Sequence, residues 1–540
     1  MIPSHFTFLD RLPRTPNGKV DRDALTAPDS WRQLASTDHA SAGDPVAACL
    51  ADLLGLQSLS ADDDFFLAGG HSLTAVTAAA RVSEQLGLHL PSHTLYVAST
   101  PRRLHHLAQW TRAGCDVDSF AAEEPAVEQH DLTGLQVSDP PPPTGPPQRI
   151  LLTGATGYVG VHLLAELQRS TTARIICLVR ASDRHCAEAR VRDNLSRRHL
   201  PDDLAPDRVE FLPGDLATRR LGLNEEDFQN LAHGVDHIFH AAALVDQVAP
   251  ASVLRGTNID GTRTLIGLAA AGRLSWLHHI STMSVYWPRG HDTPQGITEQ
   301  SATGPLDRLL NGYACTKLHA EHLAKSAAAV GVPVTIHRLG SVTGHTGHTS
   351  GDTNTFLYRD IIGCIQMGRT AALDYNLMFA PVDFATTALR ALALNARRPG
   401  ETYNITLPGS YRWSQLIERL AHHGYPLDVL PYGKWVAALH DDIAQHHSNA
   451  LTPLLPLLSR RTPEGLFLTE DHYTPVPSSN HHTFQRFADL DIAPPPTGES
   501  VADACITDLR QRGKIPSPAP SSTTSPFADA ALQKRENTTT

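Results

Sequence analysis

Three sets of residues in this chain have the types and spacing that chemistry on a bound group requires. The first is Ser72, which follows two glycines in the run Gly69-Gly-His-Ser72. The second is the turn Gly154-Ala-Thr-Gly-Tyr-Val-Gly160, and the third is the pair Tyr313 and Lys317. A serine at a helix start can carry a covalent group, a glycine turn can hold a phosphate, and a phenol beside an ammonium can move a proton.

Tyr313 and Lys317 are predicted to face the same way, because residues four apart on a helix are neighbours and this helix is expected to run to about Val330. A free tyrosine has a pKa of about 10. A nearby ammonium favours the phenolate, so we expect Lys317 to lower the pKa of Tyr313 and make it a usable proton donor near neutral pH. An earlier strand, ending Ile280-Ser-Thr-Met-Ser-Val-Tyr286, supplies hydroxyl groups. The Y-x-x-x-K spacing is common by chance, so it indicates catalysis only in this context.

The glycine turn has the context that nucleotide binding requires. A short apolar strand, 150–153, comes before it, and a helix is predicted from Tyr158 to Leu167. Backbone N–H groups at such a helix start can hold a pyrophosphate, and glycines let it approach. The second strand ends at Arg180, where an NAD enzyme usually places an acid. An arginine there favours the 2′-phosphate of NADPH, with Arg190 either as a second contact or as part of a solvated helix face.

The composition indicates a soluble protein with several domains. The 540 residues, 41% hydrophobic and 19% charged, are too many for one ordinary core. A net charge of −11 argues against a broad surface for nucleic acid or an anionic membrane. Seven scattered cysteines, with neither a signal peptide nor a long apolar run, favour a cytoplasmic location. For His345, His348 and Asp352, close together in sequence, we favour polar loop chemistry, and no metal is predicted.

Shifts in sequence pattern divide the chain into segments. Residues 44–113 are predicted to form a small bundle of four short helices, and residues 114–148, rich in proline, an extended linker. Residues 149–515 alternate strands and helices, which predicts a doubly wound parallel α/β sheet (a Rossmann fold) with a smaller substrate lobe after about 341. Residues 516–540 are expected to be a disordered tail. The strands are expected at 150–153, 175–179, 209–212, 237–240, 276–280 and 334–337.

The segment 44–113 resembles the peptidyl-carrier domains of nonribosomal peptide synthetases. The resemblance rests on Asp62-Asp-Asp-Phe-Phe-Leu67 before Ser72, on His71 and Leu73 beside it, and on the helices on both sides. It implies that Ser72 receives 4′-phosphopantetheine from a separate phosphopantetheinyl transferase, and that the thiol of this arm carries an acyl group.

Residues 1–28 resemble the C-terminal end of an adenylate-forming domain. A strand is expected at 6–9, and Asn17-Gly-Lys-Val-Asp-Arg22 matches the last motif of that family. The rest of such a domain is absent from this sequence, so we expect Lys19 to activate nothing here. The sequence leaves open whether Met1 is a true start or the boundary of a fragment, and what loads the carrier.

Residues 149–515 resemble the thioester reductase domains of nonribosomal peptide synthetases, aminoadipate reductases and carboxylic acid reductases, which are extended short-chain dehydrogenase/reductases. Besides the glycine turn and the Tyr–Lys pair, the motifs are Arg338-Leu-Gly-Ser-Val-Thr-Gly344 and Pro381-Val-Asp383. The resemblance implies that Tyr313, Lys317 and Thr282 are catalytic, with Ser281 and Ser284 as hydroxyls that could be confused with Thr282. It also implies contacts with the cofactor from a larger set: Gly154, Thr156, Gly157, Tyr158, Gly160, Arg180, Arg190, Asp215, Leu216, Ala242 and Asn258.

Together, the two resemblances imply NADPH-dependent reductive release of an acyl, aminoacyl or peptidyl thioester from the arm on Ser72, giving an aldehyde. Further reduction to the alcohol is left open by the sequence, as are the acyl group and the oligomeric state. Upstream adenylation or condensation modules, in cis or in trans, are the expected partners, and neither nucleic acid nor a membrane is expected.

Three alternatives have to be weighed against this interpretation. A redox-inactive release domain of the Dieckmann cyclising type tends to lose the tyrosine, whereas Tyr313 is present. A sugar-nucleotide epimerase or dehydratase shares the sheet and the Tyr–Lys pair, but a fused carrier argues against it. A non-catalytic carrier or docking fragment is opposed by four intact residues, but the missing activation chemistry leaves it open. These residues are Gly154, Thr282, Tyr313 and Lys317.

Overall fold

A computed structural model describes most of residues 44–113 and 145–518. Its contacts divide the chain into two compact units, residues 1–126 and 127–540. The strand expected at 6–9, the adenylation-like segment 1–28 and nearly all of the tail 516–540 lie outside the described residues. The description covers 44–61, 63, 65, 68, 70, 72–88, 90, 94–113, 132, 135, 137, 145–286, 296–304, 309–446, 449–462, 465–473 and 476–518.

The first unit contains four described helices: α2 (Pro45–Leu54), α3 (Ser72–Leu86), α4 (Thr94–Val97) and α5 (Pro101–Arg112). Asp44 caps α2 through the backbone N–H of Val46 at 2.9 Å, and its carboxylate lies 2.8 Å from Nε2 of His105 on α5. Thr100 caps α5, and both helices begin with proline, which is favourable in a first helical turn. Fully buried apolar side chains fill the core: Val46, Leu50, Phe65, Ala75, Leu95, Leu104 and Leu107.

The second unit is built on a parallel sheet of seven strands in the order β11-β6-β5-β4-β1-β2-β3. This order places β1 between β2 and β4: β2 and β3 extend the sheet on one side of β1, and β4, β5 and β6 extend it on the other. All six strands predicted from the sequence are present in it, and β11 is a seventh that the sequence did not predict. The strands are β1 (Arg149–Thr153), β2 (Arg174–Val179), β3 (Val209–Pro213), β4 (His237–His240), β5 (Trp276–Thr282), β6 (Val334–Leu339) and β11 (Thr402–Ile405).

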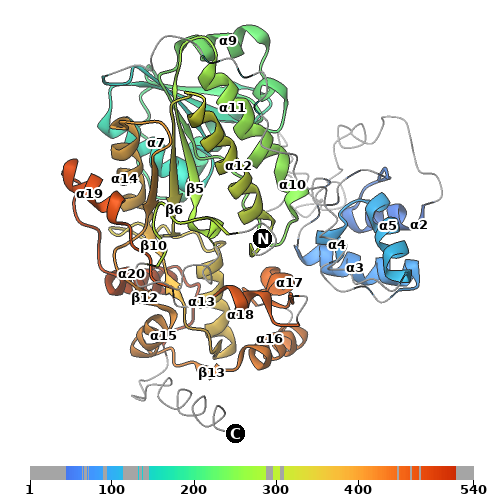
Figure 1. Ribbon diagram of the computed structural model, residues 1–540. Helices are drawn as coiled ribbons and strands as arrows, with labels where there is room; N and C mark the ends of the chain where they lie inside the picture. Colours follow the sequence, from blue (N-terminus) through green and yellow to red (C-terminus); the bar gives the residue numbers. More distant parts are fainter. Residues whose placement is uncertain are drawn as a thin grey trace, which may run out of the picture. The chain divides into compact units, whose positions relative to one another are not determined.

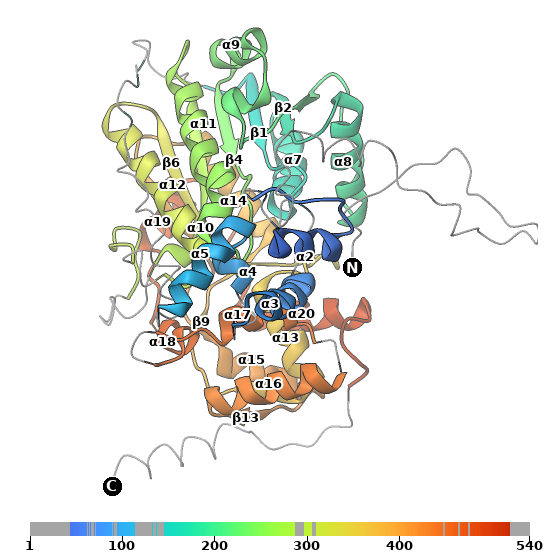
Figure 2. The same cartoon turned by 90° about the vertical axis from the view of Figure 1, so that its right-hand side faces the viewer.

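Helices cover both faces of the sheet, so most of the residues in its strands are buried (Figures 1 and 2). Along β1, Ile150 and Leu152 face one hydrophobic cluster, and Leu151 faces the other. The first cluster lies under α7 (Tyr158–Ser170), α8 (Arg184–Arg197) and α14 (Val382–Leu394). The second lies under α9 (Glu225–Gly234), α11 (Gly261–Ala270) and α12 (Gly312–Ala329). Between α10 (Ala251–Arg255) and α11, residues 256–260 form one π-helical turn.

A smaller lobe follows β6 and contains several short strand pairs and helices. Its strands pair as β7 (Ser341–Thr343) with β10 (Phe379–Pro381), β8 (Arg369–Ala371) with β13 (Asp428–Leu430), and β9 (Asn376–Leu377) with β12 (Tyr411–Arg412). Its helices are α13 (Phe356–Met367), α15 (Trp413–His422), α16 (Tyr432–His446), α17 (Leu455–Leu458), α18 (Leu468–His472), α19 (His481–Asp489) and α20 (Gly498–Gln511). A short 3-10 turn in this lobe is η6 (Thr452–Leu454). Two others, η1 (Arg219–Gly222) and η3 (Met283–Val285), come before β6 in the chain.

The segment expected to be an unpacked linker contains three residues that do pack. Leu132, Leu135 and Val137 lie partly buried against the hydrophobic cluster under α9, α11 and α12. Three aliphatic side chains within a few residues can bury apolar surface even in a segment of low overall hydrophobicity. The remaining residues between 114 and 144 lie outside the described part.

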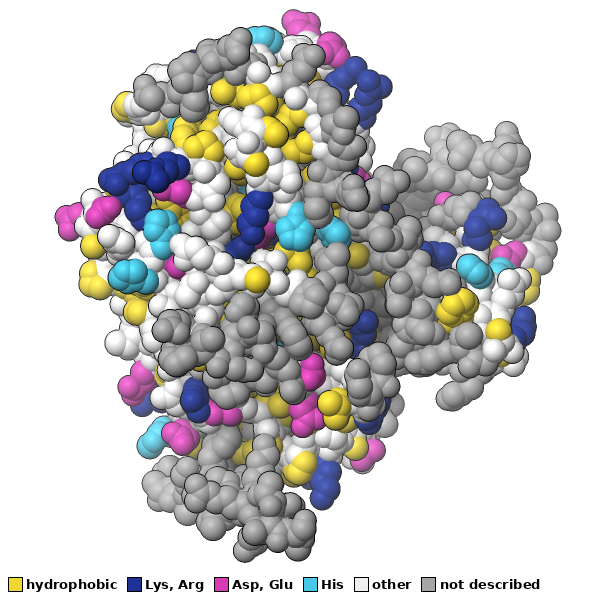
Figure 3. Space-filling view, viewed as in Figure 1, with side chains coloured by type: hydrophobic (Ala, Val, Ile, Leu, Met, Phe, Trp, Pro, Cys, Tyr) yellow, Lys and Arg dark blue, Asp and Glu magenta, His cyan; other side chains and the backbone are white. Residues whose placement is uncertain are grey.

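The described surface of the larger unit carries charges of both signs. On the face that Figure 3 presents, basic and acidic side chains are interspersed. His345 stacks on His348 with ring centroids 4.0 Å apart, and its Nδ1 lies 3.9 Å from Asp383, whereas Asp352 lies 3.5 Å from Arg198. These loop residues therefore make polar contacts with different partners. Among the helices that the structure describes, none combines the length and the apolar composition that a bilayer span needs.

Candidate active site

The glycine turn between β1 and α7 is shaped by close backbone contacts. Gly154 has φ +85°, and a Cβ built on it would lie 2.6 Å from the backbone nitrogen of Ala242, at the end of β4. A Cβ on Gly160 would lie 2.0 Å from the carbonyl oxygen of Gly154. Only glycine fits these two positions, because any side chain would displace backbone. The turn therefore lies where the carboxyl ends of β1 and β4 meet, the place where doubly wound sheets bind nucleotides.

The start of α7 fits a pyrophosphate. Gly157 is its N-cap residue and supplies no side-chain hydrogen bond, so the first N–H groups of the helix have no side-chain cap. Asn194 of α8 donates a hydrogen bond of 3.1 Å from Nδ2 to the carbonyl oxygen of Gly157, which stabilises the turn. Thr156 is half-buried within the turn. These residues fit a dinucleotide cofactor.

Arg180 and Arg190 are brought together at the end of β2. Both are exposed, and Nη1 of Arg190 donates a hydrogen bond to the carbonyl oxygen of Arg180. Two guanidinium groups thus lie beside the end of the strand next to β1. Asp215 follows β3, the next strand outward, and its carboxylate accepts a hydrogen bond of 2.9 Å from the N–H of Ala217.

Two predicted cofactor residues have side chains that are engaged elsewhere. The hydroxyl of Tyr158 donates to the carbonyl oxygen of Thr343 on β7 at 3.1 Å, and the guanidinium of Arg198 lies 4.7 Å from its ring centre. Leu216 is buried in the hydrophobic cluster under α9, α11 and α12. A cofactor contact at either position would therefore come from the backbone.

Asn258 connects the loop after β4 with α12. Its Oδ1 accepts from the N–H of Leu244 at 2.8 Å, and its Nδ2 donates to the Leu244 carbonyl at 3.1 Å and to Oγ1 of Thr316 at 3.0 Å. The amide is buried and both of its protons are used, so Asn258 positions this loop rather than offering a free donor. It lies in the π-helical turn 256–260, an irregularity often found near functional sites. Ala242 is half-buried in the same loop, and its N–H donates to Oγ1 of Thr153 at 3.3 Å.

The structure distinguishes the three hydroxyls at the end of β5. Ser281 is buried and donates a hydrogen bond of 2.6 Å to Oε1 of Glu321. Thr282 is half-buried and Ser284 is exposed, and their hydroxyl oxygens lie 3.1 Å apart. Because side chains alternate between the two faces of a strand, Ser281 and Thr282 point in opposite directions. Of the three residues, only Thr282 and Ser284 are not fully buried.

Tyr313 and Lys317 both lie in the first half of α12, which Asn311 caps through the N–H of Ala314 at 2.9 Å. Burial raises the pKa of Tyr313 to about 12. The expected lowering of this pKa by Lys317 is therefore wrong for this structure. The reason is that Nζ of Lys317 is held against β5, 3.1 Å from Nε2 of His279 and 2.8 Å from the carbonyl oxygen of Ile280.

Lys317 itself has an unusual environment for an ammonium group. It is 2% exposed, and burial lowers its pKa to about 8 against the opposing charge of Glu321. Burial, together with the charge of Lys317, holds the pKa of His279 well below its usual value, so this ring is neutral and can accept a hydrogen bond. Lys317 can therefore change its protonation state close to neutral pH.

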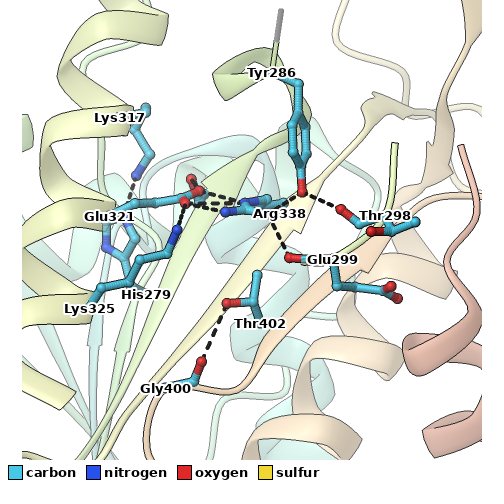
Figure 4. A network of polar contacts seen from close by, with 11 residues as sticks. His279, Tyr286, Thr298, Glu299, Lys317, Glu321, Lys325, Arg338, Gly400 and Thr402 are labelled. Atoms are coloured by element: carbon cyan, nitrogen blue, oxygen red, sulfur yellow. Dashed lines mark hydrogen bonds and ion pairs between the residues drawn. The ribbon is translucent and has the colours of Figure 1, made fainter. Parts of the chain in front are cut away.

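Behind Lys317, a buried ion pair joins α12 to β6 (Figure 4). The carboxylate of Glu321 accepts hydrogen bonds from Nη2 and Nε of Arg338, at 2.6 and 2.9 Å. Burial would raise the pKa of Glu321, but the hydrogen bonds and charge of Arg338 outweigh it and hold that pKa below its usual value. Arg338 also donates to the hydroxyl of Tyr286, which itself donates to the carbonyl oxygen of Thr298 at 2.8 Å. The ion pair thus fixes the carboxyl ends of β5 and β6 against the middle of α12.

Three residues of this site were not found from the sequence: Asn194, His279 and Glu321. Glu321 had a usable signal, because Tyr313, Lys317 and Glu321 follow one another at four-residue intervals and so share one side of the helix. Asn194 and His279 had none, since their partners are distant along the chain.

In the first unit, Ser72 is the first residue of α3, as predicted. His71 and Gly69 lie outside the described residues, and so do the side chains of Ser72 and Leu73.

Comparisons with known proteins agree with this arrangement. Residues 44–107 match the family described as the phosphopantetheine attachment site, and residues 152–389 match the family described as male sterility protein, an NAD-binding domain. The crystal structure of the terminal R domain from the myxalamid PKS-NRPS biosynthetic pathway is 33% identical, with a TM-score of 0.66, and the match covers 72% of this chain and 97% of that domain. The chain belongs to the terminal reductase family of nonribosomal peptide synthetases.

Curated relatives of this terminal reductase are much longer proteins. The isonitrile lipopeptide synthase of Streptomyces coeruleorubidus is 35% identical over 81% of this chain and 31% of its own length. A linear gramicidin synthase of Brevibacillus parabrevis is 31% identical over 85% of this chain and 9% of its own length. The chain thus spans about a third or less of these relatives. It contains a carrier domain of the phosphopantetheine type followed by an NAD-binding reductase domain.

Proposed function

We propose that this chain is an NADPH-dependent thioester reductase that releases an acyl group from its own carrier domain as an aldehyde. The observation that carries the proposal is the site at the end of β5, where the buried Lys317 of α12, four residues after Tyr313, is held against β5. The same chain also contains a glycine turn that fits a dinucleotide, and a carrier domain.

Each residue of the site has a definite role in this proposal. When bound, NADPH supplies a hydride to the thioester carbonyl carbon. Tyr313 donates a proton to the carbonyl oxygen, and its raised pKa supports this role because it keeps the phenol protonated at neutral pH. Thr282 donates a hydrogen bond to the same oxygen as negative charge develops on it. Lys317 in its charged form would orient the nicotinamide ribose. As the carbon–sulfur bond breaks, the proton that the oxygen received passes to the sulfur, so that the aldehyde and the free thiol of the carrier arm are formed.

The decisive experiment compares two tyrosine variants in protein whose carrier has been loaded with an acyl thioester. Tyr313→Phe should slow NADPH oxidation by at least about 100-fold, because general acid catalysis typically contributes that much. Tyr425→Phe is the matched control, since the Tyr425 hydroxyl donates to the carbonyl of Pro516, in the C-terminal lobe. Near-normal turnover by Tyr313→Phe would contradict the assigned role of Tyr313.

The preference for NADPH rests on Arg180 and Arg190. Replacing either by alanine should weaken NADPH binding by roughly 10- to 100-fold, the range for a lost charge-assisted hydrogen bond, and leave NADH binding nearly unchanged. Arg192→Ala is the control on the same helix, because its guanidinium is bound to Glu188 and Asp202. Dissociation constants from nucleotide fluorescence would measure the effect. An Arg190→Ala protein that binds NADPH like the wild type would assign Arg190 to the solvated helix face.

The carrier domain requires partners for this function. A phosphopantetheinyl transferase would attach the arm to Ser72, and upstream synthetase modules, in cis or in trans, would load it. Transfer from an attached arm replaces a bimolecular encounter with an intramolecular one, so a weak intrinsic affinity for the acyl group would suffice.

A further inference from the structure

The C-terminal lobe contains a small cavity with aromatic walls and one carboxyl group. Its volume is about 20 Å³, and it lies between α13, β8, α15, α16 and α18. Such a volume holds one water-sized group. The rings that line it belong to Phe356, Tyr375, Trp413, Tyr432, Trp435 and Tyr473.

Asp360 is the one acidic residue that lines this cavity. Burial raises the pKa of Asp360 to about 7, although hydrogen bonds from Cys364 and Tyr375 favour its charged form. Among the described residues, no lysine, arginine or histidine forms an ion pair with it. A carboxylate placed among aromatic rings without a cation is costly, because the charge loses its hydration. A bound cation is therefore a component that would offset this cost.

The surrounding side chains narrow the chemistry of that component. Two of the polar groups in the walls are already bound within the protein: the Tyr432 hydroxyl donates to the carbonyl of Leu458 at 2.9 Å, and Nε1 of Trp413 donates to Oγ1 of Thr370 at 3.1 Å. The rings of Tyr375 and Tyr473 are stacked with centroids 4.3 Å apart. Aromatic faces attract cations, and a carboxylate accepts hydrogen bonds from an ammonium group.

The cavity also lies next to the segment that leads into the catalytic helix. Phe356 and Tyr473, which line it, pack against a cluster formed by Leu310, Leu457 and Leu468. Leu310 directly precedes Asn311, the cap of α12, and Tyr313 lies in the first turn of that helix. The wall of the cavity and the segment that leads into α12 thus belong to one hydrophobic cluster.

We propose that this cavity is a subsite of the reductase that binds a primary ammonium group of the acyl chain, through Asp360 and the surrounding aromatic faces. The proposal rests on the reductase function proposed above and adds a substrate class to it: aminoacyl or peptidyl groups with a free, protonated amine. The size of the cavity fits a primary ammonium head rather than a bulkier quaternary one.

The first test needs no turnover. Binding of n-butylammonium chloride to the full-length protein is followed by tryptophan fluorescence at pH 8, with 1-butanol as the neutral analogue of equal length. We expect the ammonium to bind at least about tenfold more tightly than the alcohol, and Asp360→Asn to remove the difference. Asp428→Asn, an exposed acid on β13, is the matched control and should bind like the wild type. Equal binding of ammonium and alcohol by the wild type would overturn the proposal.

The pH dependence of n-butylammonium binding separates a charge-binding site from a neutral carboxyl. The amine stays protonated up to about pH 10, so binding should increase as pH rises from 6 to 8, where Asp360 loses its proton. The other titratable groups facing Asp360 are Cys364, Tyr375, Tyr432 and Tyr473, whose pKa values are all raised, so they stay protonated throughout this range. Binding that falls over the same range would mean that protonated Asp360 donates to a neutral ligand, and would overturn the proposal.

The second test uses turnover and the loaded carrier. The arm is charged with Nα-acetyl-lysyl or Nα-acetyl-norleucyl thioester, which differ by the terminal amine, and NADPH oxidation is measured. The lysyl group should be reduced at least about tenfold faster, and this ratio should fall to near one in Asp360→Asn and persist in Asp428→Asn. A ratio near one in the wild type would overturn the ammonium subsite and leave the reductase function standing. If neither thioester is reduced, the reductase proposal fails, and the binding test still decides about the cavity.

Discussion

At the scale of single residues, the main consequence of the structure is that the pKa values of Lys317 and Tyr313 are shifted in opposite directions. Burial raises that of Tyr313 to about 12 and lowers that of Lys317 to about 8. Reduction of a carbonyl consumes a proton, so a protonated phenol is the form that the reaction needs. The group that titrates near neutral pH is then the lysine, and not the tyrosine.

This difference predicts an alkaline limit to activity. If charged Lys317 is required, the rate of NADPH oxidation by loaded protein should fall as pH rises through about 8, by about tenfold at one pH unit above the pKa. In Lys317→Arg the guanidinium stays charged, so the limb should move to higher pH, even if the maximal rate is lower. Rates are corrected for spontaneous thioester hydrolysis measured with Tyr313→Phe. If the rate of Lys317→Arg falls over the same pH range as that of the wild type, the titrating group is not Lys317.

At the scale of elements, three neighbouring strands share a row of buried histidines. Nδ1 of His237 on β4 lies 2.9 Å from Nε2 of His278 on β5. Nδ1 of His278 lies 2.8 Å from Oγ1 of Thr335 on β6, which lies 2.9 Å from Nε2 of His337. Burial lowers the pKa of His237 to about 4, that of His337 to about 3, and that of His278 well below its usual value. These rings cross the sheet as neutral partners in one hydrogen-bonded row.

The histidine row predicts a loss of stability in mild acid. An unfolded histidine has a pKa of about 6.5. Below that pH these histidines bind protons in the unfolded chain but stay neutral in the folded one. The free energy of unfolding should fall by about 1.4 kcal/mol per pH unit for each such histidine, between pH 6.5 and about 4. Asp360, with its pKa raised to about 7, acts in the opposite sense, but it is one group against several. Urea unfolding between pH 8 and pH 5 measures the slope above the range in which ordinary carboxylates titrate.

Two variants provide the controls for this slope. His337→Gln should make the pH dependence shallower by about one proton, because a neutral amide replaces a ring that titrates on unfolding. His440→Gln, at an exposed position on α16, should leave the slope unchanged. Stability that is constant from pH 8 to pH 5 would contradict the neutral state of the histidine row.

Elements were predictable from the sequence where the pattern is local. The strands β1 to β6 are short apolar runs between turns, and α12 follows from the spacing of its residues. β11 was missed because Thr402-Tyr-Asn-Ile405 is short and half polar, and it becomes a strand by pairing in parallel with β6. The contacts of Lys317 with β5 could not be predicted, since they depend on the packing of α12 against the sheet. For the same reason, the direction of the Tyr313 pKa was mistaken.

The lobe after β6 is the part of the structure that local sequence patterns predict least well. The aromatic residues around Asp360 come from segments spread between residues 356 and 473, and no spacing rule joins them. Their apolar character alone predicts a core. Only the fold brings a carboxyl group among them.

At the scale of the whole molecule, the chain combines a carrier domain and a reductase domain, and neither is informative alone. The four-helix domain, in which α3 begins at Ser72, would by itself indicate a carrier but not the reaction that its acyl group undergoes. A Tyr–Lys pair behind a glycine turn would by itself be one of many dehydrogenases. Their presence in one chain is what favours an acyl thioester as substrate and an attached arm as the means of delivery.

The most direct test of this account is the fate of the nicotinamide hydride. Holo-protein loaded with an acyl thioester is given NADPH deuterated at the transferred position, and the released product is analysed by mass spectrometry. Reductive release predicts an aldehyde with one deuterium on its carbonyl carbon, or an alcohol with two, and no product from Ser72→Ala, which cannot be loaded. Release of an acyl product without deuterium and without NADPH consumption, as a cyclising domain would give, would contradict it.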